Sequence, residues 1–352
     1  MNSTGKRGSR EGLRRVAPKP AMAVSHSVFE FPLPLGETID FMTPTEKLFV
    51  LSHLGIPAID TSAWTLDLAG LLATSISLRY EDLGDFPQKR LCTVHQCAGN
   101  PLDPMTPTRT IANVEWRGVL LRDILERCGV KRSCTHVWAF GADFGQFGIP
   151  PHTSPPQEHY VKDLPLDYAL NHDVMVVTHL NGEPLPEKHG YPARLVAPGH
   201  YGHNSVKWLC RVEAADRRAD GYFTTELYND PASGTEKAKP AWAIAPESII
   251  VSPSHANEFS DPEMTVWGWA WSASGVRCVD ITFDGGRSWV SADVAPREQQ
   301  SWQRFSYRWQ IDGSGVYHIG SRATNSEGQS QPLADARNAV HTVRVVCNLR
   351  SA

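Results

Sequence analysis

The sequence lacks a long hydrophobic run and a strong excess of either charge. Its 352 residues carry a formal net charge of -4, with 20% charged and 41% hydrophobic residues. Nucleic acids and anionic membranes attract strongly basic surfaces, so neither is expected as a partner. No apolar stretch approaches the roughly 20 residues that a membrane-spanning helix needs. The composition predicts a soluble globular protein.

Paired cysteine motifs are also missing. The seven cysteines are an odd number, widely scattered and without a C-x-x-C pair. This argues against a disulfide framework and against the common zinc and iron–sulfur spacings. The sequence shows no C-x-x-C-H haem attachment site and no G-x-G-x-x-G nucleotide fingerprint. The chain is therefore expected to carry no haem or flavin of its own.

The first twenty residues contain six Lys or Arg, one Glu and almost no large apolar side chains. Residues 1–28 are predicted to form a disordered basic tail. Arg14-Arg15 is similar to a twin-arginine export signal, but no apolar stretch suited to a signal core follows it. A cytoplasmic location is expected, with export left open.

The length favours two domains, because one hydrophobic core rarely serves more than about 300 residues. We expect residues 29–232 to form a domain of mixed helices and strands. Val174–Leu180 and Ala193–Gly199 have the β-branched composition of buried strands, whereas Gly118–Val130 has helical spacing of apolar residues. Gly129 occupies the position of a helix C-cap.

A linker is predicted at residues 233–246, and short alternating strands follow it in residues 247–352. An Asp-Gly turn at Asp284 separates two of these strands, as in a β-hairpin. The size and spacing predict an antiparallel, immunoglobulin-like β-sandwich. The overall fold class is therefore α+β.

Two polar clusters in the first domain are candidates for a functional site. Cys97 lies in the segment HQCAGN, where an expected strand turns at small residues. A second cluster of His, Arg, Asn and Lys side chains, with three glycines, fills Glu187–Val212. Basic side chains beside glycine turns suit an anionic, phosphate-bearing ligand.

The residues leave three chemistries open for Cys97. A Cys–His hydrolase would use His95, which shares one face of the strand with Cys97. A zinc site would need further ligands at recognisable spacing, and these are missing. The third possibility is a metal site in which Cys97 is the one protein ligand and an organic cofactor supplies the others. The basic cluster would then hold the phosphate of that cofactor.

The order of motifs along the chain resembles the sulfite oxidase family, which includes the assimilatory nitrate reductases. The resemblance covers residues 29–348. It rests on LFVLSHLGIPAID, HQCAGN, NGEPLPEKHGYPARLVAPGHYGHNSVKWL and the C-terminal segments GWAWS, VDITFDGGRSW and HTVRV. It implies a molybdopterin-binding catalytic domain followed by a dimerisation domain, and hence a homodimer.

The resemblance also implies roles for individual residues. Cys97 would be the only protein ligand of molybdenum, since a thiolate suits a metal already bound by sulfur. Tyr228 would lie in the active site close to the metal. The implied cofactor-binding side chains are His53, Asp143, His189, Arg194, His203, Asn204 and Lys207. The implied reaction is oxygen-atom transfer, with electrons passed to a separate acceptor such as a cytochrome.

The sequence departs from the family where sulfite should bind. Arginines expected in that pocket are replaced by Leu51, by Pro101-Leu102 and by Asn204. Each lost charge-assisted contact would be worth about 1.5–3 kcal/mol. Sulfite oxidation remains the default expectation, and Arg109, His200 or His203 would have to supply the missing donors.

The main alternative is a less charged organic sulfur or nitrogen substrate, with catalysis in the oxidising or the reducing direction. A non-catalytic scaffold and a metal-free Cys–His hydrolase are more distant alternatives.

Overall fold

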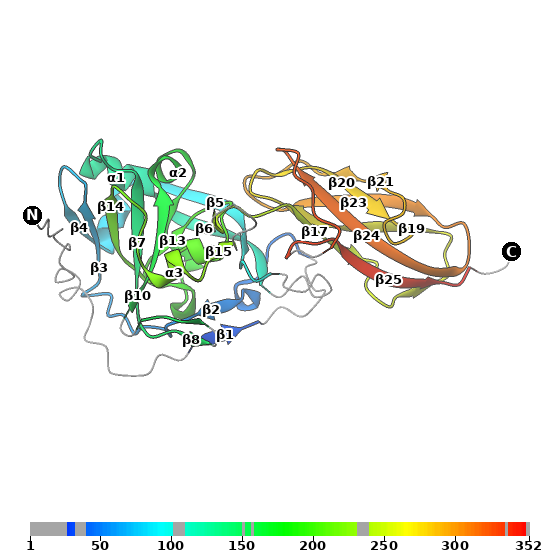
Figure 1. The fold of residues 1–352 in the computed structure, drawn as a ribbon, viewed down its shortest axis with the longest axis horizontal. Helices are drawn as coiled ribbons and strands as arrows, with labels where there is room; N and C mark the ends of the chain where they lie inside the picture. The colour runs from blue at the N-terminus through cyan, green and yellow to red at the C-terminus, as the bar shows by residue number, and fades with distance from the viewer. Residues whose placement is uncertain are drawn as a thin grey trace, which may run out of the picture.

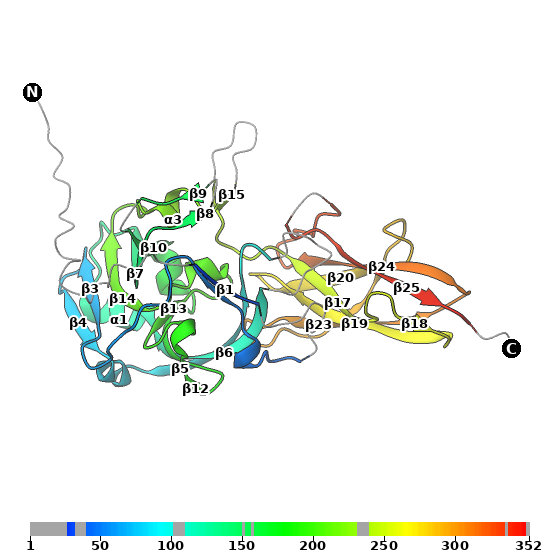
Figure 2. The same ribbon diagram turned by 90° about the horizontal axis from the view of Figure 1, so that it is seen from below.

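The computed structural model shows two bodies joined end to end (Figure 1, and from a second side Figure 2). It describes residues 27–31, 40–100, 110–149, 152–155, 158–230, 239–334 and 337–349. The predicted basic tail lies almost entirely outside these residues, as do Pro101, Leu102 and Arg109. No helix of the described chain is long and apolar enough to cross a membrane.

A five-stranded sheet forms one side of the first body. Its order is β10-β7-β14-β3-β4, and β14 pairs with β3 in the parallel direction whereas the other neighbours are antiparallel. Its strands are β3 (Thr65–Gly70), β4 (Ile76–Arg79), β7 (His136–Gly145), β10 (Glu158–Pro165) and β14 (Leu209–Ala215). One face packs against α1 (Leu121–Cys128) in the largest hydrophobic core of this body.

A second sheet in this body has the order β12-β11-β6-β5, with β13 also paired to β11. Its strands are β5 (Gln88–Gln96), β6 (Ile111–Leu120), β11 (Met175–Leu180), β12 (Glu183–Pro184) and β13 (Arg194–Val196). The strand β5 is an edge of this sheet and leads directly into Cys97.

Short elements complete the first body. The helices are α2 (Leu166–Asn171) and α3 (Tyr222–Thr225), and the 3-10 turns are η2 (Thr45–Lys47), η3 (Glu81–Asp85), η4 (Glu187–His189) and η5 (Gly202–Asn204). The paired short strands are β1 (Val28–Glu30) with β2 (Val50–Ser52), β8 (Gly148–Ile149) with β9 (His152–Thr153), and β15 (Asn229–Asp230) with β16 (Lys239–Pro240).

The helix expected at Gly118–Val130 is shorter than predicted. Residues 118–120 belong to β6 and pair with β11, and Leu120 has the extended backbone of an N-cap. Gly129 ends the helix as expected: its φ is 70° and its N–H donates to the carbonyl of Leu125 at 3.0 Å. Helices are few and short among the described residues, so the α+β prediction overstated them.

The second body consists of two sheets around one core. The sheet orders are β17-β19-β23-β22 and β18-β25-β24-β20-β21, and apolar side chains of both sheets meet between them. The strands are β17 (Glu247–Ser252), β18 (Glu258–Phe259), β19 (Glu263–Trp271), β20 (Val276–Thr282), β21 (Val290–Ser291), β22 (Asp293–Val294), β23 (Gln303–Gln310), β24 (Gly315–Asn325) and β25 (His341–Cys347).

The pairing of β20 with β21 agrees with the hairpin predicted around Asp284. One pair departs from the antiparallel expectation, because β18 runs parallel to β25. The immunoglobulin-like topology stays a prediction.

A separate hydrophobic core crosses the junction between the two bodies. Val94 and Ala98 of the first body pack there with Trp269, Trp271 and Trp302 of the second. Residues 239–246, within the predicted linker, take part: Ala241 and Ile244 are buried in this core, and the carbonyl of Trp242 accepts the N–H of Tyr201. The junction is therefore a packed interface.

Candidate active site

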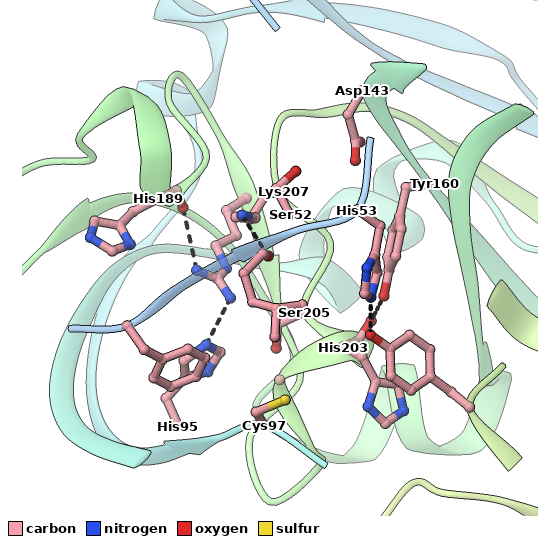
Figure 3. Close-up of a pocket in the computed structure, with 15 residues that line it drawn as sticks. Ser52, His53, His95, Cys97, Asp143, Tyr160, His189, His203, Ser205 and Lys207 are labelled. Carbon is pink, nitrogen blue, oxygen red and sulfur yellow. Dashed lines mark hydrogen bonds between the residues drawn. The ribbon is translucent and has the colours of Figure 1, made fainter. Parts of the chain in front are cut away.

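A pocket in the first body gathers the two polar clusters of the sequence. Its volume is about 600 Å³, a figure that includes space open to solvent. Figure 3 shows the labelled side chains converging from several elements. The lining residues are Phe49, Leu51, Ser52, His53, His95, Cys97, Asp143, Tyr160, His189, Arg194, Gly202, His203, Ser205, Lys207 and Tyr228.

Cys97 begins the turn that follows β5. Its N–H donates to the carbonyl of Thr110 at 2.9 Å, and its own carbonyl accepts the N–H of Asn100 at 3.0 Å. The sulfur accepts a long hydrogen bond of 3.4 Å from the N–H of Gly99. Burial raises the pKa of the Cys97 thiol, while Gly99 and the Arg337 guanidinium act in the opposite direction. A cationic metal would favour the thiolate much more strongly.

One wall of the pocket is cationic. Arg194 is 4% exposed and donates to the imidazole Nε2 of His95 at 2.9 Å and to the carbonyl of His189 at 3.3 Å. Its guanidinium carbon also lies 5.0 Å from the ring centre of Trp116. Burial lowers the pKa of Arg194 to about 9. These partners orient the guanidinium, but none of them neutralises it.

Lys207 extends this wall. Its Nζ donates to the carbonyl of Leu51 at 3.1 Å. Burial lowers the pKa of Lys207, as does Arg194, and burial raises the pKa of the nearby Asp143. Neither Arg194 nor Lys207 forms a salt bridge with a carboxylate of the described residues. An anionic ligand would therefore relieve a real electrostatic cost.

The opposite wall is aromatic and neutral. A hydrogen bond of 2.5 Å joins His53 Nε2 to the Tyr228 hydroxyl, and the ring of His203 stacks on that of Tyr228 with centres 4.0 Å apart. The hydroxyl of Tyr160 donates to the carbonyl of His203 at 2.8 Å. Burial, together with Lys207, lowers the pKa of His53 to about 4, and burial raises the pKa of Tyr228 well above 10. Both side chains are uncharged at neutral pH.

Several buried atoms of the pocket have no hydrogen-bond partner among the described residues. They are Arg194 Nε, His189 Nε2, His53 Nδ1, His203 Nδ1 and Asp143 Oδ1. Buried polar groups in native proteins are rarely left unsatisfied. These donors and imidazole nitrogens lie next to one thiol and to two cations that form no salt bridge among the described residues. Together they fit a large polar anionic cofactor that also carries a metal.

The pocket contains most of the residues that the sequence nominated. Asn204 is the exception: it is fully buried behind the pocket, where its amide donates to the carbonyls of Tyr201 and Ala241. His200 also lies away from the lining and stacks on Tyr168. The roles of all these residues remain predictions.

Sequence reasoning assigned no individual site role to six lining residues: Phe49, Ser52, Tyr160, Gly202, Ser205 and, except as a hydrolase base, His95. The imidazole of His95 is held by Arg194 and stacks on Phe49, with ring centres 5.4 Å apart. Burial and Arg194 lower its pKa well below 6.5. These contacts make His95 a support for Arg194 and count against a hydrolase in which it activates Cys97.

Two family descriptions match the chain. "Oxidoreductase molybdopterin binding domain" matches residues 53–223, and "Mo-co oxidoreductase dimerisation domain" matches residues 238–348. The solved structure of the sulfane dehydrogenase SoxCD from Paracoccus pantotrophus is similar over 99% of this chain and 93% of that one, with a TM-score of 0.77 and 26% identity.

Curated relatives show the same similarity. Sulfite oxidase of Gallus gallus is 30% identical over 83% of this chain and 68% of its own length. Mitochondrial sulfite oxidase of Homo sapiens is 30% identical over 78% of this chain, and the nitrate reductase of Hordeum vulgare is 29% identical over 77%. The chain spans 53–60% of the length of the primate sulfite oxidases and 33% of the nitrate reductase. Both domain matches and these relatives show that the chain belongs to the sulfite oxidase family of molybdenum-cofactor-dependent oxidoreductases.

Proposed function

We propose that this protein oxidises a reduced sulfur compound less charged than sulfite, using a molybdenum cofactor bound in the pocket at Cys97. The observation that carries the proposal is the asymmetry of the pocket. Buried cations that form no salt bridge among the described residues lie on one wall, and a neutral aromatic group lies on the other (Figure 3). The first wall suits the cofactor, and the second suits the substrate.

The cationic wall would hold the organic part of the cofactor. Arg194, Lys207 and His189 supply donors and positive charge, and Cys97 supplies the thiolate ligand. When bound, the cofactor supplies oxygen-atom transfer coupled to a two-electron change at the metal. His95 keeps Arg194 in position, so the protein provides a rigid cradle that an anion completes.

The neutral wall would contact the substrate. Tyr228, held by His53 and His203, presents a hydroxyl whose pKa is too high for ionisation at neutral pH. Such a hydroxyl orients a substrate by hydrogen bonding without adding negative charge. Substrate sulfur would gain one oxygen atom from water, and two electrons and two protons would leave.

The substrate class follows from the charge of this wall. Sulfite is a small dianion that bidentate guanidinium groups hold well. Among the described residues, Arg194 is the only arginine that lines the pocket, and it belongs to the cofactor wall. The similarity to a sulfane dehydrogenase also supports a sulfur substrate with little charge at the reacting atom.

The electrons would pass one at a time to a separate acceptor protein of the cytochrome class. The match to a dimerisation domain supports a homodimer formed through the second body.

Metal analysis combined with a substrate comparison tests this proposal. Protein purified from a host that makes the cofactor should contain about one molybdenum per chain. With ferricyanide as acceptor, a neutral dialkyl sulfide and a singly charged alkyl persulfide should be compared with sulfite, and thiosulfate, a dianion like sulfite, serves as the control for charge. We expect kcat/KM for the sulfide or the persulfide to exceed that for sulfite by about tenfold or more.

Cys97→Ser and Cys278→Ser form a matched pair for the metal ligand. Cys278 is half-buried in the second body, away from the pocket. We expect Cys97→Ser to lower kcat by about a hundredfold or more, because the soft thiolate ligand is lost, and Cys278→Ser to retain activity. Full activity of Cys97→Ser, or a protein without molybdenum from a competent host, would refute the proposed function. Preference for sulfite would refute the substrate class alone.

A further inference from the structure

We propose that the second body positions the metal-binding turn, with Glu247, Trp271 and Arg337 acting through Gln96 and the carbonyl of Ala98. These two residues flank Cys97 directly. The inference rests on the proposed function only in taking Cys97 as the metal ligand. It gives the C-terminal body a part in the chemistry of the first body, beyond any role in dimerisation.

The edge strand that carries the turn is completed by the second body. The N–H of Cys92 donates to the side-chain oxygen of Gln299 at 2.6 Å. The N–H of Val94 donates to the carbonyl of Gln300 at 3.1 Å, and the N–H of Gln300 returns a bond to the carbonyl of Cys92 at 3.1 Å. An uncovered edge would leave these groups to water. The last part of β5 is therefore fixed by residues about two hundred positions later in the chain.

Gln96 continues this contact at the residue before Cys97. Its side chain is fully buried, and its Nε2 donates to Glu247 Oε2 at 2.5 Å and to the carbonyl of Asn100 at 2.8 Å. Its Oε1 accepts the indole N–H of Trp271 at 3.0 Å. Both donors and the acceptor of the amide are thus used. One side chain ties the two ends of the turn together and fixes both to the second body.

Arg337 holds the other side of Cys97. Its Nη1 donates to the carbonyl of Ala98 at 3.0 Å, and its Nη2 forms a salt bridge of 2.7 Å with Asp230. The guanidinium also lies over the ring of Tyr201, 5.1 Å from its centre. Asp230 follows Tyr228 closely in the chain. Arg337 therefore connects the turn of the thiol to the segment that carries the substrate-facing tyrosine.

The burial of Glu247 argues that the contact serves a purpose beyond holding two bodies together. The residue is 2% exposed, and its Oε1 has no partner among the described residues. An apolar side chain would join two bodies at lower cost than a buried carboxyl group. A carboxyl oxygen at this point does what an apolar group cannot, because it fixes the rotation of the Gln96 amide.

The test compares single substitutions in the full chain, purified with the cofactor. Arg337→Met and Trp271→Phe remove a donor at each side of Cys97 with little change of volume, and Glu247→Leu removes the acceptor. Glu247→Gln restores an acceptor oxygen and serves as the conservative rescue. Trp302→Phe is the matched control, because it removes a junction hydrogen bond to the carbonyl of Phe41 and leaves the contacts with β5 and the turn intact.

Three readouts separate positioning from simple stability. We expect Arg337→Met and Glu247→Leu to lower kcat by about tenfold or more with KM within about twofold, because a small displacement of a reacting centre is costly. The electron paramagnetic resonance signal of the one-electron-reduced metal should shift in the same variants. Glu247→Gln and Trp302→Phe should keep the wild-type kcat and signal.

The third readout does not need the metal. In the full chain from a host without the cofactor, labelling of Cys97 by iodoacetamide, followed by mass spectrometry of its peptide, should be several-fold faster in Arg337→Met and Glu247→Leu than in wild type. Unchanged kcat, signal and labelling would overturn this inference and leave the proposed function standing. A wild-type protein without molybdenum would refute the proposed function. The labelling rates would still test whether the second body positions the turn of Cys97.

Discussion

Histidine is the residue that most shapes the response of this protein to acid. Burial is the main cause that lowers the pKa of His53 and His341 to about 4 and of His189 and His200 to about 3. Between these values and 6.5, the unfolded chain binds protons that the folded chain does not. The free energy of unfolding therefore decreases as the pH falls from 6.5 towards these values.

Two buried carboxyl groups act in the opposite direction. Burial raises the pKa of Asp143 and of Glu247, so the folded state takes up protons there before the unfolded state does. The histidines outnumber them. The balance predicts a thermal midpoint that falls between pH 6.5 and pH 4 in the cofactor-free protein.

Replacing one of these histidines by an aromatic residue that does not ionise should reduce the loss of stability at acid pH. His200 is 7% exposed and stacks on Tyr168 with ring centres 3.9 Å apart, which Phe would preserve. A histidine whose pKa falls from 6.5 to about 3 accounts for about 3 kcal/mol of destabilisation at pH 4. We expect His200→Phe to be more stable than wild type at pH 4, and the difference to shrink markedly at pH 7.5. Parallel thermal-melt profiles from pH 4 to 7.5 would contradict this.

At the scale of elements, the contact of β6 with β11 depends on a single glycine. A Cβ atom at Gly118 would lie 2.2 Å from the carbonyl oxygen of Val176 and 2.5 Å from the Cα of Val177. Backbone atoms cannot move aside as a flexible side chain can. The close approach of the two strands therefore requires glycine here.

Substitution of this glycine should therefore destabilise the fold. We expect Gly118→Ala to lower the free energy of unfolding by about 3 kcal/mol, because the strands must separate to admit a methyl group. Gly84→Ala is the matched control, since no atom lies within 4 Å of the position of a Cβ there. Chemical denaturation measures both. Equal stability of the two variants would show that the sheet yields at little cost.

The same glycine explains where sequence reasoning misplaced an element. Apolar residues after Gly118 have helical spacing, and the glycine looked like the start of a helix. In the fold, residues 118–120 pair with Met175–Val177, and the helix begins only at Leu121. Periodicity shows which residues face a core. It does not show that these residues pair with a strand about 55 positions later in the chain.

Strands with their own local signals were predicted well. The segments around β11, β19, β23 and β25 combine β-branched or aromatic residues with alternation, and the structure places strands there. The pocket shows a different limit of prediction from sequence. Cys97 and Arg194 could be nominated because their motifs are compact, whereas Tyr160 reaches the pocket from β10, which carries no such motif. Only the long-range pairing of the sheets brings Tyr160 there.

At the scale of the whole molecule, the tryptophan core at the junction couples the two bodies. Trp302 is 1% exposed, stacks on Trp269 with ring centres 5.2 Å apart and donates its indole N–H to the carbonyl of Phe41 in the first body. Because the core is shared, neither body keeps its buried surface once the other unfolds. We therefore expect one cooperative calorimetric transition for the wild-type chain.

Truncation of this side chain should uncouple the bodies. Trp302→Ala is expected to cost about 3–5 kcal/mol and to split the transition into two. The half-buried Trp289, whose indole bonds within its own hairpin, provides the control: Trp289→Ala should cost less and leave a single transition. A wild-type protein that already melts in two steps, only one of which responds to Trp302→Ala, would show that the junction does not couple the bodies.

The contacts of Arg337 and Glu247 with the turn of Cys97 also have a consequence for biosynthesis. Translation delivers about 5–20 residues per second, so Arg337 leaves the ribosome on the order of ten to fifty seconds after Cys97. Until then the thiol belongs to a nascent chain whose edge strand has no cover. The pocket acquires its final form only when the second body has folded against the first. A chain released before residue 337 would lack the side chain that donates to the carbonyl of Ala98, next to Cys97.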